Sequence, residues 1–353
     1  MNRSRIPALA LAALVAVLGA SRADAQAYNF TTLDYPGASR TYAYGISGSD
    51  IVGYWTDSSN YEHGFLHSGT DYNTGWSTID NPNALSQVLH GEGTNLYGIT
   101  GNLAVGVYNA SGDTFHGFLY NTTTAAFTTI DYNAATGTTS GDKPTPLRNH
   151  GGTYTDGIFG NTVVGTYEDN NGFGMSHSFL YDITKDPTLA SSYTVLPDYT
   201  KASTTLGGIA AYGISGSNIV GTYVDDNDVL NGFLYNSITQ QYKTIDDGVF
   251  GTNIFGIDGS YISGSYIDSQ GKDNGFLYNM ASSTFTTIDD PLGSNFTQGE
   301  GNSDYKVVGY YNGSDGIAHG FLATTPEPGT LALFTGLGIT GLSLFIHRRL
   351  RRN

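Results

Sequence analysis

The chain has no cysteine among its 353 residues, and it is poor in basic side chains, proline and tryptophan. Without cysteine there are no disulfides, no thiolate metal ligands and no cysteine nucleophile. Lysine and arginine together number 15 against 31 aspartates and glutamates, which gives a formal net charge of -16. Such a protein repels nucleic acid and anionic membrane surfaces. We therefore expect no nucleic-acid partner, and a preference for cations or cationic partners.

Helix-type apolar periodicity is missing outside the two ends of the chain. Glycine (48) and tyrosine (26) are abundant instead. Short alternating runs broken by Gly, Asn and Asp predict an all-β fold. Residues 26–325 contain 29 acidic and 8 basic side chains, so this body is more acidic than the whole chain. At 300 residues it is long enough to be held by its core alone.

The first 25 residues have the three parts of a secretory signal peptide. A start with two arginines is followed by an apolar middle, residues 7–20. Small residues and the expected first mature residue mark the cleavage site: Ala23, Ala25 and Gln26. The apolar stretch is shorter than the roughly 20 residues that span a bilayer. We predict a cleaved signal peptide, with an uncleaved membrane anchor as the alternative.

The last 28 residues, 326–353, have the layout of a sorting tail. A Pro-Glu-Pro motif comes first, and an arginine cluster follows an apolar run that ends at residue 346. The motif and cluster residues are Pro326, Glu327, Pro328, Arg348, Arg349, Arg351 and Arg352. The run is just long enough for one transmembrane helix, and arginines behind such a helix stay cytoplasmic. The body would then lie outside the membrane.

This tail resembles the PEP-CTERM sorting signal of Gram-negative bacteria that make extracellular polysaccharide. In that family a membrane enzyme, exosortase, is the expected recogniser and processor of the tail. The resemblance implies an exosortase-type partner and a cell-surface or secreted destination. Whether the tail is cleaved or kept as a permanent anchor stays open.

The body, residues 26–325, is one unit repeated six times. Each unit contains a Gly-Phe-Leu anchor, with Ser178 in place of glycine in one unit. The anchor phenylalanines are Phe65, Phe118, Phe179, Phe233, Phe276 and Phe321. A Gly-Ile segment and a Gly-x-Tyr segment precede the anchor and a Thr-Ile-Asp segment follows it, so a unit has four strand candidates. Four strands in a period of about 40–50 residues are typical of a β-propeller.

The Thr-Ile-Asp segments indicate how the ring closes. None follows the sixth anchor, whereas the chain begins with a related segment, residues 30–36, that has no unit before it. A closed ring needs this arrangement, because closure removes exposed strand edges. We predict an all-β six-bladed β-propeller closed by its N-terminal strand. The glycine beside the aromatic in each Gly-x-Tyr segment predicts close approach of neighbouring blades, with the ring filling the gap.

The repeats resemble the HAF-type extracellular repeats of bacteria, named for His-Ala-Phe at the anchor. Histidine precedes four anchors and asparagine the other two: His63, His116, His177, His319, Asn231 and Asn274. The resemblance implies an extracellular β-rich repeat domain and brings no active site. We expect these histidines to form hydrogen bonds at a strand start. A shared metal ion is disfavoured, because equivalent positions of different blades are usually too far apart.

Alternating strand directions place two sets of loops on one face of the ring, those before the anchor and those after Thr-Ile-Asp. These loops contain 21 of the 29 acidic residues of the body and the long insertions. We predict that binding residues lie on this acidic face. Seven acids, Glu300 among them, are assigned to the opposite face, and Asp156 falls within a strand.

Carboxylates in the turns before the anchor are candidate calcium ligands, because calcium prefers oxygen donors. The densest are Asp225, Asp226 and Asp228 in one unit, and Asp268 with Asp273 in the next. Neither group has the spacing of an EF-hand loop. Aspartates also serve simply to form hairpin turns. Turn formation is the favoured interpretation of any single turn, with calcium as the alternative.

The sequence contains no catalytic constellation, and no Gly-x-Ser-x-Gly elbow follows a strand. We therefore predict an exported, non-catalytic binding or structural propeller of the cell surface or extracellular matrix. Its expected partners are extracellular polysaccharide or other surface proteins. The alternative is a secreted glycan-active hydrolase or lyase that uses carboxylates of the acidic face.

Overall fold

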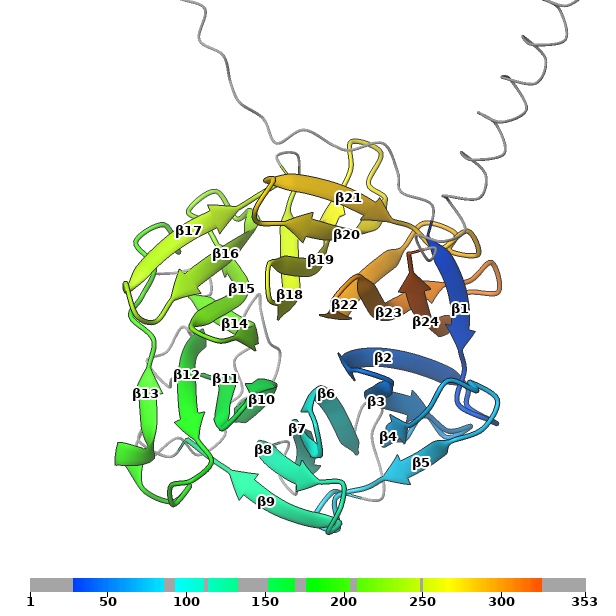
Figure 1. The fold of residues 1–353 in the computed structure, drawn as a ribbon, viewed down its shortest axis with the longest axis horizontal. Coiled ribbons are helices and arrows are strands. Elements are labelled where there is room, and N and C mark those ends of the chain that lie inside the picture. The colour runs from blue at the N-terminus through cyan, green and yellow to red at the C-terminus, as the bar shows by residue number, and fades with distance from the viewer. Residues whose placement is uncertain are drawn as a thin grey trace, which may run out of the picture.

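The computed structural model describes residues 28–85, 93–110, 114–132, 152–168, 176–203, 208–247 and 250–325. Within these ranges the regular structure is β-strand, apart from one short 3-10 helix, η1 (Ala190–Ser192). The strands form six four-stranded antiparallel sheets that stand as blades around a central axis (Figure 1). The predicted six-bladed β-propeller is confirmed.

The four segments of the repeat become the four strands of a blade, in order from the axis outwards. The Gly-Ile strands are innermost: β2 (Arg40–Ser47), β6 (Thr94–Thr100), β10 (Thr153–Phe159), β14 (Ile209–Ser215), β18 (Thr252–Asp258) and β22 (Thr297–Ser303). The Gly-x-Tyr strands are second: β3 (Asp50–Thr56), β7 (Leu103–Ala110), β11 (Thr162–Glu168), β15 (Asn218–Val224), β19 (Tyr261–Ile267) and β23 (Lys306–Asn312). The anchor strands are third: β4 (Glu62–His67), β8 (Thr114–Asn121), β12 (Ser176–Asp182), β16 (Leu230–Asn236), β20 (Asp273–Asn279) and β24 (Ala318–Thr324). The outermost strands are β5 (Trp76–Ile79), β9 (Ala126–Ile130), β13 (Tyr193–Val195), β17 (Gln241–Ile245), β21 (Thr284–Ile288) and β1 (Asn29–Leu33).

The first strand of the chain completes the last blade, as the sequence predicts. β1 pairs with β24 in antiparallel register, with Leu33 opposite Gly320. Leu33 is fully buried and packs against Phe65 of the first blade and Val308 of the sixth. Figure 1 shows β1 beside β24, which closes the ring between the two ends of the described chain. Closure therefore stabilises the fold through both ladder hydrogen bonds and apolar burial.

Neighbouring blades approach each other closely at glycines of the innermost strands. A Cβ added to Gly45 would lie 3.1 Å from the Cα of Gly98 in the next blade, and one on Gly98 would lie 3.1 Å from the Cα of Gly157. Between the sixth and first blades, a Cβ on Gly301 would lie 2.3 Å from the carbonyl oxygen of Tyr44, whereas one on Gly45 would lie 2.8 Å from that of Tyr97. A side chain at this ring of glycines would push two blades apart.

The predicted role of the Gly-x-Tyr glycines is wrong in its location. A Cβ on Gly53 would lie 2.0 Å from the carbonyl oxygen of Tyr42 and 2.9 Å from the ring of Phe65. Both belong to the same blade, so this glycine makes room within its own sheet. The aromatic that follows, Trp55, stacks on His63 of the adjacent strand, with ring centroids 4.5 Å apart.

The six anchor phenylalanines form the centre of the core. Each has no exposed surface, and each belongs to a cluster that joins side chains of neighbouring blades. Truncating a fully buried phenylalanine to alanine costs about 3–5 kcal/mol. These residues therefore have a structural role.

Candidate functional site

A β-bulge in every innermost strand builds the candidate site. In β2 the register with β3 slips between Ala43 and Gly45, and the other five innermost strands slip at the equivalent place. The extra residue of a bulge is left out of the ladder and its side chain is redirected. The six bulge residues are Tyr44, Tyr97, Asp156, Tyr212, Phe255 and Glu300. Four aromatic and two acidic side chains are thereby brought to the axis.

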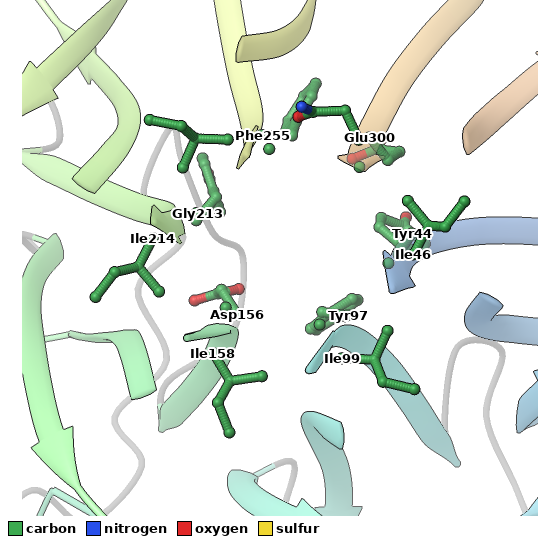
Figure 2. Close-up of a pocket in the computed structure, with 18 of the residues that line it drawn as sticks. Tyr44, Ile46, Tyr97, Ile99, Asp156, Ile158, Gly213, Ile214, Phe255 and Glu300 are labelled. Carbon is green, nitrogen blue, oxygen red and sulfur yellow. The ribbon is translucent and has the colours of Figure 1, made fainter. Parts of the chain in front are cut away.

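These six side chains line an axial cavity of about 300 Å³. Figure 2 shows Tyr44, Tyr97, Asp156 and Glu300 around the open centre. The isoleucines two positions after the bulges also line the cavity, and they belong to the apolar clusters between blades. The rings of Tyr44 and Tyr97 meet edge to face at 5.1 Å. The cavity wall thus combines aromatic and aliphatic side chains, with two acidic groups among them.

Glu300 is the most perturbed acid of the cavity. Its relative exposure is 6 %, and no hydrogen bond from the described residues reaches its carboxylate. Burial, reinforced by the negative charge of Asp273, raises the pKa of Glu300 to about 8. In the described part of the chain, no lysine, arginine or histidine lines the cavity to balance it. The assignment of Glu300 to a loop of the opposite face is wrong, because it lies inside β22.

Close to Glu300, a series of side-chain hydrogen bonds crosses the interface between the fifth and sixth blades. The side-chain amide of Gln298 donates to Oδ2 of Asp273 at 3.2 Å. The hydroxyl of Tyr310 donates to Oε1 of Gln298 at 2.8 Å. Burial raises the pKa of Asp273 to about 6, and burial also raises the pKa of Tyr310 well above its usual value. Asp273 thus adds a further acidic group beside the cavity, at the interface between these two blades.

Asp156 contributes the second cavity carboxylate, from β10. Its relative exposure is 6 %, and the hydroxyl of Thr166 donates to Oδ2 at 3.4 Å. Asp156 and Glu300 thus reach the axis from different blades. Sequence reasoning missed both as functional candidates. The sequence did contain a signal for them, namely the residue directly before the glycine of each Gly-Ile segment. This residue is aromatic in four repeats and acidic in these two.

The carboxylates proposed as calcium ligands are placed in two different environments. Asp225 accepts hydrogen bonds from the backbone N–H of Asn227 at 2.9 Å and of Val229 at 3.0 Å, which lowers its pKa. Asp268 makes the same pattern with Gln270 and Lys272. These are turn-forming contacts, as the favoured interpretation predicts.

Asp226 and Asp228 lie exposed in the same turn as Asp225. Asp273, by contrast, faces the blade interface and does not join Asp268 in one group. The described residues contain no set of three His, Asp or Glu side chains arranged to hold a metal ion. Calcium binding stays a prediction.

The histidines before the anchors form hydrogen bonds, as expected. Nδ1 of His63 lies 2.9 Å from Asp80, and His116 and His319 make the same contact with Asp131 and Asp34. His177 lies 3.6 Å from Asp198. The hydrogen bond with Asp131 raises the pKa of His116. These pairs link the third and fourth strands of their blades at the rim, away from the axis.

The predicted signal and sorting residues lie outside the described residues. These are Ala23, Ala25, Gln26, Pro326, Glu327, Pro328, Arg348, Arg349, Arg351 and Arg352. Over residues 28–325, with their gaps, no helix has the length and apolar character needed to cross a membrane.

Comparison with known proteins supports the fold alone. No protein-family model matches the chain, and neither does any curated protein. Among solved structures, AofleA from Arthrobotrys oligospora is 12% identical over 84% of this chain and 86% of its own, with a TM-score of 0.50. TolB from Acinetobacter baumannii is 10% identical over 79% of this chain and 65% of its own, with a TM-score of 0.47. The fucose-specific lectin from Aleuria aurantia is 11% identical over 84% of this chain and 99% of its own, with a TM-score of 0.44.

Proposed function

We propose that this propeller is an exported, non-catalytic binding protein of the cell surface or extracellular matrix that holds its ligand in the axial cavity. The carrying observation is the set of six bulge side chains that converge on one cavity. A cavity of this size suits a small molecule or one unit of a polymer. Aromatic rings pack against the apolar faces of sugars, and carboxylates accept hydrogen bonds from hydroxyl groups. Extracellular polysaccharide is therefore the proposed partner.

The composition of the cavity favours binding over nucleophilic catalysis. Its lining in the described chain includes no serine, threonine, histidine or lysine. Nucleophilic catalysis by a hydroxyl group requires such a nucleophile and a base beside it. Tyr44 and Tyr310 of the wall are not activated, since burial raises the pKa of each well above its usual value.

One observation favours a glycan-active hydrolase as the second candidate. Glu300, with its raised pKa, holds a proton at neutral pH, as a general acid must. Asp156 supplies another carboxylate to the same cavity, and glycoside hydrolysis uses two carboxyl groups with divided roles. The product of the reaction distinguishes this candidate from simple binding.

Export and sorting form the cellular part of the proposal. The N-terminal 25 residues would be removed by signal peptidase, and an exosortase-type enzyme would act on the tail that begins at Pro326. Replacing the Pro-Glu-Pro residues by alanine should shift the protein between membrane, surface and medium fractions. An unchanged distribution would contradict the sorting role.

The central test uses residues 26–325, because the closed ring is complete within residues 28–325. This protein is mixed with extracellular polysaccharide of the producing organism, and both the bound fraction and the polymer length are measured. We expect binding without shortening, weakened in Glu300→Gln and retained in Asp304→Asn, an exposed acid of the same blade. Shortening of the polymer would establish the hydrolase. Absence of binding would redirect the search to a protein partner, and repetition with a chelator tests calcium.

A further inference from the structure

The axial cavity holds a buried acidic side chain that has no hydrogen-bond partner among the described residues. Glu300 is more than nine-tenths buried, its carboxylate accepts no hydrogen bond from the described residues, and it faces the cavity. Asp156 faces the same space, and the described lining contains no basic side chain. Burying an acid without a partner costs free energy in every folded molecule. A ligand with a positive charge would supply the missing partner.

The remainder of the wall favours an organic cation over a metal ion. A hard metal ion needs several oxygen ligands around one point, and the described residues hold no group of three such side chains. The wall includes instead the rings of Tyr44, Tyr97, Tyr212 and Phe255. Aromatic faces attract ammonium groups through the ring quadrupole, and quaternary ammonium ions are recognised by such rings.

We propose that the axial cavity binds an organic ammonium group, with Glu300 as its counter-ion and the aromatic bulge residues as its walls. The inference rests on the proposed function, since it assigns a ligand class to the same cavity. Two sources offer this chemistry: an amino sugar unit of a polysaccharide and a free small amine. Their shared feature is a protonated or alkylated nitrogen on a small apolar frame.

Binding should exchange a proton for the ammonium group. In the free protein the carboxyl group of Glu300 is protonated at neutral pH, because burial raises its pKa to about 8. The arriving cation stabilises the carboxylate, so the proton leaves to solvent and the ion pair forms. The other titratable groups around Glu300 are Asp273 of β20, Tyr310 of β23 and Tyr44 of β2. Both tyrosines stay neutral over this range, and Asp273 loses its proton at lower pH, since its pKa is about 6.

Calorimetric titration of residues 26–325 tests the inference with four probes: tetramethylammonium, glucosamine, N-acetylglucosamine and glucose. We expect the two cations to bind about tenfold or more tightly than the two neutral sugars. The affinity of tetramethylammonium, whose charge does not depend on pH, should increase as the pH rises from 6 to 8. Titration in buffers of different ionisation enthalpy should show release of up to about one proton per site.

Matched variants separate the charge from the aromatic wall. Glu300→Gln should weaken cation binding by roughly tenfold and abolish its pH dependence. Phe255→Leu should weaken binding severalfold, whereas Phe255→Tyr, which keeps a ring, should not. Asp304→Asn is the control. If Glu300→Gln does not fold, the Phe255 pair and the pH dependence of the unaltered protein still decide the matter.

The outcomes distinguish this inference from the proposed function. Neutral sugars that bind as tightly as the cations, with Phe255→Leu still weakening them, would overturn the ammonium inference and keep the cavity as the site. If none of the probes binds and no cavity variant alters binding of the polysaccharide, both the ammonium inference and the cavity as the binding site are overturned. Chemical N-acetylation of the polysaccharide identifies the source. Loss of polymer binding indicates its amino sugars, and unchanged polymer binding with persistent amine binding indicates a free amine.

Discussion

The sharpest prediction concerns Glu300, because its environment in the cavity should make the protein less stable. The pKa of Glu300 is about 8 in the folded protein against an ordinary value of 4.5. Between these values the folded state keeps a proton that the unfolded chain has lost, so stability falls as the pH rises. Each pH unit above the ordinary pKa costs about 1.4 kcal/mol, which amounts to roughly 3 kcal/mol at pH 7.

Glu300→Gln removes this cost while keeping the size and shape of the side chain. We expect the variant to be more stable than the unaltered protein by roughly 3 kcal/mol at pH 7 and equally stable near pH 4. The assay is chemical unfolding of both proteins from pH 4 to pH 8. Asp304→Asn, an exposed acid in the same blade, should differ little at any pH.

A destabilised Glu300→Gln variant at pH 7, with the pH dependence unchanged, would refute this reasoning. It would mean that Glu300 is ionised in the fold and paired with a group that stabilises its charge. The converse, a more stable protein that binds its ligand less well, is the pattern of a residue kept for function at the expense of stability.

Four further predictions concern the ring, its rim and its turns. Deleting β1 should lower the free energy of unfolding by at least roughly 3 kcal/mol, since the burial of Leu33 alone is worth this much, and it should cause association through the open edge of β24. Thermal unfolding measures the first effect and size-exclusion chromatography the second. A monomer of unchanged stability would contradict closure. Gly301→Ala should destabilise by about 1–3 kcal/mol because its Cβ would meet a backbone oxygen, whereas Gly216→Asn, at a φ of 61° with open space around it, should be nearly neutral in the same unfolding assay. The pKa of His116 is raised in the folded protein, so its pairing with Asp131 stabilises the fold fully below pH 6.5, and this stabilisation is lost as the pH rises through the pKa of the folded protein. His116→Asn should flatten this part of the plot of unfolding free energy against pH. Asp225→Ala should cost about 1–2 kcal/mol through two lost turn hydrogen bonds, equally with and without chelator, and a loss confined to calcium-containing buffer would indicate a bound ion.

The fold was predictable because each repeat encodes a complete blade in local terms. Period, turn residues and the alternation of the strands identify four strands per unit, and these signals do not depend on distant contacts. Closure followed from counting, since a strand that precedes the first unit, β1, takes the place of the one that the last unit lacks. The packing partner of Gly53 was not predictable, because strand pattern alone does not tell whether a glycine faces its own sheet or the next one.

The bulges explain why the candidate site was not predicted from the sequence. A strand with strict alternation would direct Tyr44 and Glu300 to the face set by their neighbours. The one-residue slip before the glycine of each innermost strand changes that direction. Charge counting therefore drew attention to the exposed turns of the acidic face. The described carboxylates at Asp57, Asp225, Asp268 and Asp315 prove to be bonded to backbone N–H groups of their own turns.

The departures from the repeat are more informative than the repeat itself. If packing alone selected the bulge residues, an aromatic side chain would serve in all six blades, as it does in four of them. Blade six departs twice, with Glu300 for the aromatic and Asn302 for the isoleucine that follows the glycine elsewhere. Asn302 has hydrogen-bond partners within the fold, since Ser263 donates to its Oδ1 and its own amide donates to the carbonyl of Tyr261. The carboxylate of Glu300 has no such partner within the described chain, and the proposed ammonium ligand would supply one beside the sixth blade.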